Sequence, residues 1–523
     1  MKNRTILLTF IISVFCLIAR AQDTEFTNCT SIMVGKKASA DGSVITSHTC
    51  DGFYRTWMRW EPAQDHEKGA MHKVYKGTMH TADPYDSRRV ELVGEIPEVE
   101  HTYSYLNTAY PCLNEKQLAI GETTFSGPDT LVNSEGWFCI EELERIALQR
   151  CDNARDAIRV ITELAEKYGY GDGGECITIA DKNEVWLFEI MGAGPKKPGA
   201  VWAAQRVPDD EVCVSANIPR IIKLNRNDPD NFLCSDNVEK IAKKYGLWDG
   251  EGELIWYKAF SSSYSNGKNH REREYFIFNE LAPSLNLQLD DVELPFSVKP
   301  EKPVSVTDVT RLFRSTYEGT DMDMTKNLKA TDRNGDTIIS PIANPWVGSW
   351  EQETWNIVKP GTIEFRRTVA VSWCSYSFVA QLRDWLPDEI GGVCWLSVEN
   401  PGQSPRIPVF CGASKMPSCF DRCGHDRYDE ETAIWRYRKA NKLAQVQWGR
   451  TKQLMFNEIL RYEDKFQKDL PSLEKDVVRL LDEGKKDEAT RLLNNYTMEF
   501  EAATAESWKQ MEHRFWRMFA GGF

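Results

Sequence analysis

The chain has 523 residues, of which 41% are hydrophobic and 11% aromatic, and its formal net charge at pH 7 is −14. This composition is typical of a globular protein and excludes collagen-like, low-complexity and disordered classes. The negative charge argues against a nucleic-acid backbone or an anionic membrane surface as the main partner. A small or neutral substrate fits better.

The first 21 residues have the layout of a secretory signal peptide. Lys2 and Arg4 precede an apolar run over residues 6–19, and Ala19-Arg20-Ala21 supplies the small residues of a cleavage site. A membrane anchor is the alternative, but a helix needs about 20 apolar residues to span a bilayer. We therefore expect cleavage after Ala21 and an exported protein, either periplasmic or secreted.

Strand patterns dominate the next part of the chain. Residues 29–35 and 43–49 read as two strands around a polar turn that ends in Asp41-Gly42. Residues 53–117 mix aromatic, charged and proline residues without a period, which indicates loops and short strands, and residues 118–125 read as a further strand. Apolar residues at helical spacing over 141–168 predict one or two helices.

A block of strands follows and then a helical tail. Residues 176–180 and 185–190 read as a hairpin, and we expect strands near 201–207 and 212–216 in the same sheet. Residues 225–360 are rich in loops, and strand character resumes at 368–382 and 393–398. An apolar stripe over 430–519 predicts helices that cover the sheet domain. These patterns predict an α+β fold.

Three motifs suggest bound groups, and each has a plainer reading. The glycines of 169–174 match the spacing of a dinucleotide-binding loop, but a helix precedes them and a strand follows, so we read a helix stop and a turn. The acidic turn at 332–336 lacks the glutamate of a calcium loop, since Ala343 holds that position. Four residues have zinc-ligand types, although a disulfide is the better reading in an exported chain: Cys411, Cys419, Cys423 and His425. We expect no cofactor and no metal.

Cys29 is the informative cysteine, because it lies shortly after the expected signal cleavage and opens a predicted strand. A structural role is the default for one cysteine among fourteen. If residues 22–28 are a short propeptide, its removal gives Cys29 a free α-amino group beside its own thiol. The reference pKa values are near 7.7–8.0 for the amine and near 8.5 for the thiol, so one residue supplies both base and nucleophile.

The run from Cys29 to Ser43 resembles the start of the dipeptidase A, or dipeptidase D-like, cysteine peptidases of the N-terminal nucleophile (Ntn) hydrolase superfamily. Further blocks are similar to that family, so that the resemblance spans roughly residues 29–412: 118–124, 174–175, 181–189, 202–217 and 378–383. It implies a four-layer αββα sandwich with two stacked sheets. The corresponding domains are a catalytic domain over 29–429 and a helical region over 430–523 packed on it.

The resemblance also implies roles for single residues. Cys29 matches the nucleophile, and Asp51 matches the carboxylate that holds the amino-terminal group. Asn217 matches the amide that donates to the oxyanion, and Thr123 and Thr124 lie where a companion backbone donor is expected. Asp51 as a mere turn residue and Asn217 as a mere strand end are the alternatives.

One position departs from the acylase relatives in the superfamily. They carry an arginine three residues before the aspartate, where this chain has His48. An arginine is always charged, whereas histidine is charged only near or below about pH 6.5. Arg367 is a candidate for the missing cation, with a surface arginine as the alternative.

These inferences predict an exported cysteine dipeptidase that frees its own amino-terminal nucleophile and acts on small peptides, without nucleic-acid or membrane partners. Whether it forms a homo-oligomer stays open. One alternative is an Ntn amidase of the bile-salt hydrolase or penicillin acylase type. A second is a surface carbohydrate-binding protein that uses its 17 tryptophans as stacking platforms. A binding protein would begin at Gln22, whereas the enzyme would begin at Cys29.

Overall fold

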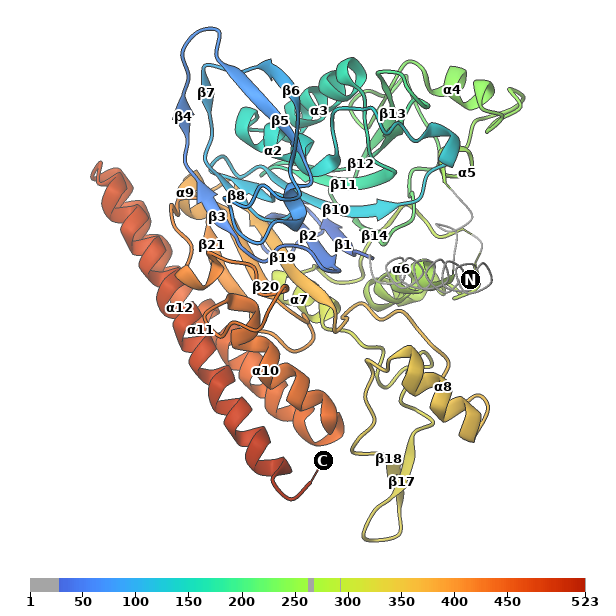
Figure 1. Ribbon diagram of the computed structural model, residues 1–523, viewed down its shortest axis with the longest axis vertical. Coiled ribbons are helices and arrows are strands. Elements are labelled where there is room, and N and C mark those ends of the chain that lie inside the picture. The colour runs from blue at the N-terminus through green and yellow to red at the C-terminus, as the bar shows by residue number, and fades with distance from the viewer. Residues whose placement is uncertain (1–27, 262–267, 292, 523) are drawn as a thin grey trace, which may run out of the picture.

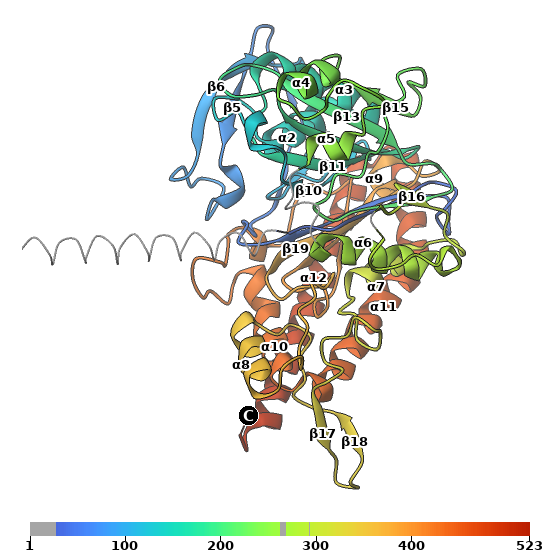
Figure 2. The same ribbon diagram turned by 90° about the vertical axis from the view of Figure 1, so that its right-hand side faces the viewer.

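The computed structural model describes residues 28–261, 268–291 and 293–522, and their fold is of the predicted α+β class. The predicted signal peptide and all of the predicted propeptide except Asn28 lie outside the described residues. Two antiparallel sheets form the centre of the molecule, with helices around them (Figures 1 and 2).

Within the described residues, the first sheet has seven strands in the order β16-β14-β1-β2-β19-β20-β21. Strand β2 pairs with β19, which places His48 opposite Phe378 and Asp51 opposite Cys374. The bounds are β1 (Ser31–Val34), β2 (Val44–Asp51), β14 (Val212–Ser215), β16 (Ser297–Val298), β19 (Cys374–Leu382), β20 (Val393–Val398) and β21 (Ile407–Phe410).

The second sheet has eight strands among the described residues, in the order β15-β13-β12-β11-β10-β9-β8-β3. Their bounds are β3 (Arg59–Glu61), β8 (Tyr105–Asn107), β9 (Leu113–Asn114), β10 (Ala119–Phe125), β11 (Gly174–Ala180), β12 (Val185–Gly192), β13 (Ala200–Arg206) and β15 (Phe232–Cys234). Three two-stranded sheets complete the strands of the described residues: β4 (Gln64–Asp65) with β7 (His101–Thr102), β5 (Met71–Lys76) with β6 (Glu91–Pro97), and β17 (Lys329–Thr331) with β18 (Thr337–Ile339).

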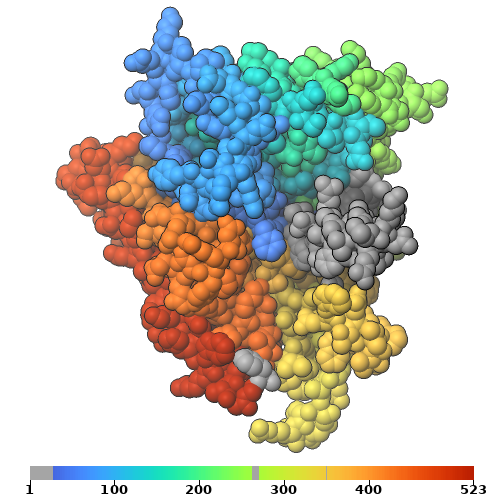
Figure 3. Space-filling model, in the orientation of Figure 1, coloured from blue at the N-terminus to red at the C-terminus, as the bar shows by residue number. Residues whose placement is uncertain are grey.

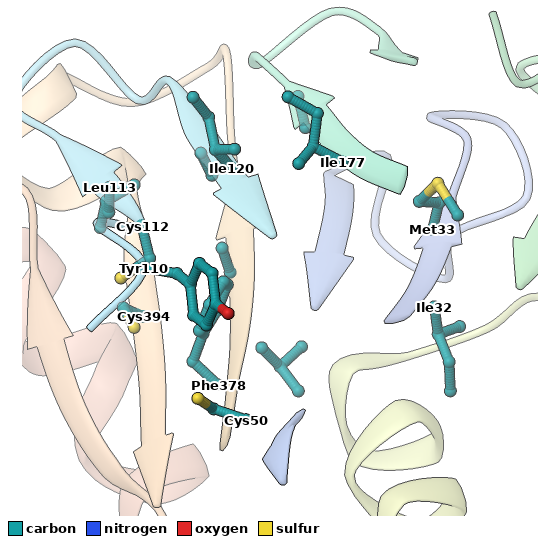
Figure 4. Packing of buried hydrophobic residues seen from close by; sticks show 14 of the residues in the cluster. Ile32, Met33, Cys50, Tyr110, Cys112, Leu113, Ile120, Ile177, Phe378 and Cys394 are labelled. Carbon is teal, nitrogen blue, oxygen red and sulfur yellow. The ribbon is translucent and has the colours of Figure 1, made fainter. Parts of the chain in front are cut away.

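The two sheets face each other where β2 packs on β10 and β11. Gly121 permits this close approach, because a Cβ atom there would lie 2.9 Å from the Ser47 carbonyl oxygen. The Thr46 and Thr178 hydroxyls hydrogen-bond across the gap at 2.5 Å. Figure 4 shows apolar side chains of both sheets in this layer, including Ile120 and Phe378.

Helices cover the outer sides of the sheets. Helices α2 (Ile140–Arg150) and α3 (Ala154–Tyr168) contact the eight-stranded sheet, and α10 (Ala433–Val446) and α12 (Lys486–Phe519) contact the seven-stranded one. The Thr497 hydroxyl on α12 donates to the Pro408 carbonyl on β21 at 2.8 Å. The remaining α-helices are α4 (Val238–Lys244), α5 (Trp256–Phe260), α6 (Lys268–Leu281), α7 (Val306–Phe313), α8 (Ser349–Val358), α9 (Asp388–Gly391) and α11 (Trp448–Asp482).

Segments that are distant in sequence meet on the face shown in Figure 3, where the blue residues after Gly52 lie directly above the orange ones near residue 420. The Met58 N–H donates to the Phe420 carbonyl at 2.9 Å, and the Cys423 N–H donates to the Ala82 carbonyl at 2.8 Å. The irregular segment 53–117 is thereby fixed to the part of the chain that leads into α10. No helix among the described residues is long and apolar enough to cross a membrane.

Most predicted elements are confirmed, and two strands differ. Strand β14 lies beside β1 in the seven-stranded sheet instead of continuing the β11–β13 block, because the chain crosses between the sheets after β13. Strand β19 begins at Cys374, well after residue 368. In the preceding loop the Arg367 side chain donates to the Thr368 and Val369 carbonyls. In a longer strand these carbonyls would instead accept hydrogen bonds from the neighbouring strand.

The plainer readings of two motifs are confirmed and a third is corrected. Helix α3 ends at Tyr168 and Gly169 has φ of 91°, so the glycine run is a helix stop. Residues 332–336 form the turn between β17 and β18. All thirteen cysteines among the described residues are free thiols, so the expected disulfide in the 411–423 segment is wrong.

Candidate active site

Cys29 lies between the two sheets, immediately before β1. Its neighbour Thr30 forms a bridge to Thr49 of β2, and only 1% of the Cys29 surface is exposed. The Cys29 thiol, a ring nitrogen of His48 on β2 and a carboxylate oxygen of Glu122 on β10 all lie within 4.8 Å of one another. Strands of both sheets therefore supply this cluster.

Arg273 on α6 holds the backbone around Cys29. Its guanidinium donates to the Cys29 carbonyl, to the Thr30 hydroxyl at 2.9 Å and to the Ala216 carbonyl at 2.9 Å. It also donates to the Asn217 Oδ1 atom at 2.8 Å. No sequence pattern predicted a role for Arg273, because a charged residue within a charged helical run is typical of a solvent-exposed face. In the structure this side chain is fully buried.

Asn217 directly follows β14 and has φ of 65°, a left-handed conformation that asparagine adopts more readily than most residues. Its Nδ2 atom donates to the Thr124 carbonyl at 2.6 Å. An amide has two N–H donors, so one is used here and the other can serve a developing oxyanion. Thr123 faces away from this contact, since its hydroxyl pairs with the Ser215 hydroxyl at 2.5 Å.

Asp51 and Arg367 form a buried ion pair next to Cys29. The Arg367 Nη2 atom lies 2.5 Å from the Asp51 Oδ2 atom and 2.5 Å from the Asn28 carbonyl oxygen. Thr49 donates to the same Asp51 oxygen at 3.0 Å. Arg367 is only 3% exposed, so the alternative of a surface arginine is wrong. The structure places a permanent cation at the peptide bond that precedes Cys29.

His48 does not replace the arginine of the acylase relatives. Burial lowers the pKa of His48 to about 4, so the ring is neutral at physiological pH. Its Nδ1 atom is 2.6 Å from the Glu122 carbonyl oxygen, and the rings of Tyr110 and Phe378 each lie 5.7 Å from it between centroids. The cations of the site are Arg367 and Arg273.

The thiol of Cys29 is protonated in the chain that still carries Asn28. Burial, followed by the nearby Glu122, Cys50 and Asp51, raises the pKa of the Cys29 thiol well above its usual value. A cavity of about 560 Å³ lies under the β5–β6 hairpin and is lined by Arg55, Trp57, Tyr105 and Arg145, among others, but not by Cys29. The Cys29 thiol is therefore both neutral and enclosed in this structure.

Two clusters among the described residues have the side-chain types of metal ligands. One is the Cys29, His48 and Glu122 cluster, and the other consists of Cys139, Glu141 and Asp172. The predicted zinc-type residues near residue 420 form no such cluster in the described chain, and the His425 Nε2 atom instead lies 2.9 Å from the Ser375 hydroxyl.

The comparison with known families decides the identity. The family model of peptidase family C69 matches residues 28–459, most of the chain. The chain belongs to peptidase family C69. It is therefore a hydrolase of peptide bonds, and the predicted resemblance to dipeptidase A-like cysteine peptidases is confirmed.

Curated relatives of this C69 peptidase are named as probable dipeptidases. A "Probable dipeptidase" of Latilactobacillus sakei is 25% identical over 445 residues, which cover 82% of this chain and 83% of the relative. A "Probable dipeptidase" of Salmonella dublin is 25% identical over 406 residues, with coverage of 73% and 81%. A "Probable dipeptidase B" of Streptococcus pyogenes serotype M1 is 23% identical over 435 residues, with coverage of 79% and 78%.

Proposed function

We propose that this C69 peptidase is an exported dipeptidase whose nucleophile is the Cys29 thiol, made amino-terminal by removal of the preceding residues. The observation that carries the proposal is the contact of one Arg367 nitrogen with both the Asn28 carbonyl oxygen and the Asp51 carboxylate. The names of the relatives support a dipeptide substrate over the acyl amides of the bile-salt hydrolase or penicillin acylase type. The signal-peptide pattern of residues 1–21 supports export.

The fold gives further support. Two facing antiparallel sheets with helices on their outer sides fit the four-layer αββα sandwich of Ntn hydrolases. In such a site the nucleophile begins the first strand between the sheets, where Cys29 lies. The family match also begins at residue 28, one residue before the proposed new amino terminus.

Maturation would begin with attack of the Cys29 sulfur on the Asn28 carbonyl carbon. The S–C bond forms as the C–N bond breaks, the thiol proton passes to the released nitrogen, and water then hydrolyses the thioester to return the thiol. Arg367 donates to the oxygen that becomes negative in this step, as a preorganised oxyanion donor would. The same guanidinium then stays beside Asp51.

In the mature enzyme the freed amine would take the proton of the Cys29 thiol. The thiolate attacks the peptide carbonyl of the substrate, and the free N–H of the Asn217 amide donates to the oxyanion. The leaving amine of the substrate takes the proton, and water releases the acyl group from sulfur. Asp51, held by Arg367 and Thr49, orients the amine of Cys29.

Intact mass and dipeptide hydrolysis test this proposal together. We expect active wild-type protein to begin at Cys29, Cys29→Ala to remain unprocessed and inactive, and Cys29→Ser to lose most turnover, because the hydroxyl is a weaker nucleophile. Cys213→Ala is a matched control, since Cys213 is also fully buried in a strand of the same sheet. Active enzyme that begins at Gln22, or wild-type hydrolysis by Cys29→Ala, would refute the assignment.

A further inference from the structure

Two buried carboxyl groups beside the nucleophile have no role in the mechanism above. Glu122 on β10 is fully buried, and Glu175 on β11 is 2% exposed. Thr124 pairs directly with Glu175 and follows Glu122 by two residues, so the three side chains point to the same face of the sheet. The Thr124 hydroxyl donates to the Glu122 Oε1 atom at 2.7 Å, and the two carboxyl groups contact each other.

This pair lacks a cation. Among the described residues, no ion pair includes Glu122 or Glu175, and the Oε2 atom of each has no hydrogen-bond partner. A buried carboxyl pair that has no cation beside it is unfavourable in a folded protein. Burial is the main cause that raises the pKa of both carboxyls, and the nearby Glu122 raises the pKa of Glu175 further.

The position of Glu122 relative to the nucleophile limits what such a ligand is. A carboxylate oxygen of Glu122 lies within 4.8 Å of the Cys29 sulfur. In a peptide the α-nitrogen is separated from its own carbonyl carbon only by the Cα atom, at about 2.5 Å, and an attacking sulfur approaches that carbon to about 3–3.5 Å. These distances allow the α-nitrogen of the residue whose carbonyl is attacked to come within hydrogen-bond reach of Glu122.

We propose that Glu122 and Glu175 form the binding site for the α-ammonium group of the substrate's first residue. This inference rests on the proposed function, because it places the scissile carbonyl at Cys29. It makes the enzyme specific for peptides with a free amino terminus and restricts cleavage to the first peptide bond, since only that carbonyl carries an ammonium group at this distance. Acylated peptides would leave the carboxyl pair without its cation.

The test compares L-alanyl-L-alanine with propionyl-L-alanine, which has the same shape but no amine. We expect Glu175→Gln to lower kcat/KM for alanyl-alanine by about 10- to 100-fold, the loss of one charged hydrogen bond, and to leave propionyl-alanine unchanged. Glu122→Gln should have the same two effects on the two substrates. Glu144→Gln is the matched control, because Glu144 is equally buried and lacks hydrogen-bond partners for both oxygens, but it belongs to α2.

Other outcomes separate the two claims. The ammonium site would be refuted by a wild-type enzyme that prefers propionyl-alanine. It would also be refuted if the glutamine variants lowered kcat/KM for both substrates by the same factor, because the carboxyls would then serve the amine of Cys29 itself. If propionyl-alanine turns over too slowly to measure, the ratio of the inhibition constants of alanine amide and propionamide gives the same comparison. Dipeptide hydrolysis that survives Cys29→Ala would instead refute the proposed function.

Discussion

The Arg367 side chain allows the sharpest test of how maturation and stability depend on one group. Arg367→Gln removes the charged partner of the Asp51 carboxylate, which is fully buried and keeps the Thr49 hydroxyl as a donor to Oδ2. Removal of one partner of a buried ion pair costs about 3–5 kcal/mol of the free energy of unfolding. The variant also loses the donor at the Asn28 carbonyl oxygen, so maturation should slow by roughly 100- to 1,000-fold, the effect of one oxyanion donor.

Denaturant unfolding and the time course of intact mass after cell-free synthesis measure the two effects separately. Arg314→Gln is the matched control, since Arg314 and Glu463 form another ion pair with side chains only 11% and 9% exposed. This pair joins the end of α7 to α11. We expect a similar loss of stability there but maturation at the wild-type rate. Arg367→Lys retains the charge and should recover stability more than maturation. If Arg367→Gln matures as fast as the control, Arg367 has a structural role only and our account of the first step is wrong.

Three further predictions concern the other groups of the site. Asn217→Ala should lower kcat by about 100- to 1,000-fold with little change in KM. Asn217→Gly, in which glycine tolerates the left-handed backbone, should lower kcat by the same factor. A variant that only raises KM would refute the oxyanion role. Dipeptide hydrolysis should survive a chelator and be lost to iodoacetamide with peptide mass mapping to Cys29, whereas recovery of a chelated enzyme on adding zinc would refute the metal-free mechanism. Burial lowers the pKa of His48 to about 4, from 6.5 in the unfolded chain. Between pH 6.5 and pH 4 the unfolded state therefore binds more protons than the folded state. The free energy of unfolding falls as the pH drops through this range, by about 3 kcal/mol from this group. Urea unfolding at pH values from 7 to 4 should show a smaller fall in the free energy of unfolding for His48→Gln than for the wild type. An equal fall in the two proteins would contradict this prediction.

Local patterns were enough to predict most of the fold. The strand pairs near Cys29 and at 174–192 have short polar turns, and the tail has a long apolar stripe, so these elements follow from neighbouring residues alone. The position of β14 does not, because its sequence is equally suited to either sheet and only the crossing of the chain decides between them. The start of β19 depends on Arg367, whose contacts with backbone carbonyls no local pattern reveals.

The candidate site could be predicted only at positions that match a motif of the family. Cys29, Asp51 and Asn217 come from the resemblance, and the structure brings Asp51 and Asn217 to the backbone next to Cys29 through Arg367 and Arg273. Arg367 was a candidate for the missing cation, but its contacts with Asp51 and the Asn28 carbonyl could not be predicted. Arg273 was not predicted, because it comes from a helix far along the chain and such long-range contacts leave no sequence spacing to detect. Glu122 and Glu175 lie within blocks of the resemblance, yet as charged residues in predicted strands they gave no sign that they face each other in a buried layer.

The charges around Cys29 explain why its reactivity would depend on maturation. Glu122 and Asp51 disfavour a thiolate, so with Asn28 attached the thiol stays neutral. Asp51 also favours a nearby cation, and the proposed cleavage before Cys29 would create one, the α-ammonium group of Cys29 itself. An ammonium group beside the sulfur offsets the repulsion that the carboxylates exert on a thiolate. The negative charge of Asp51 would therefore disfavour the thiolate while Asn28 is attached and favour the ammonium–thiolate pair once the amine is free.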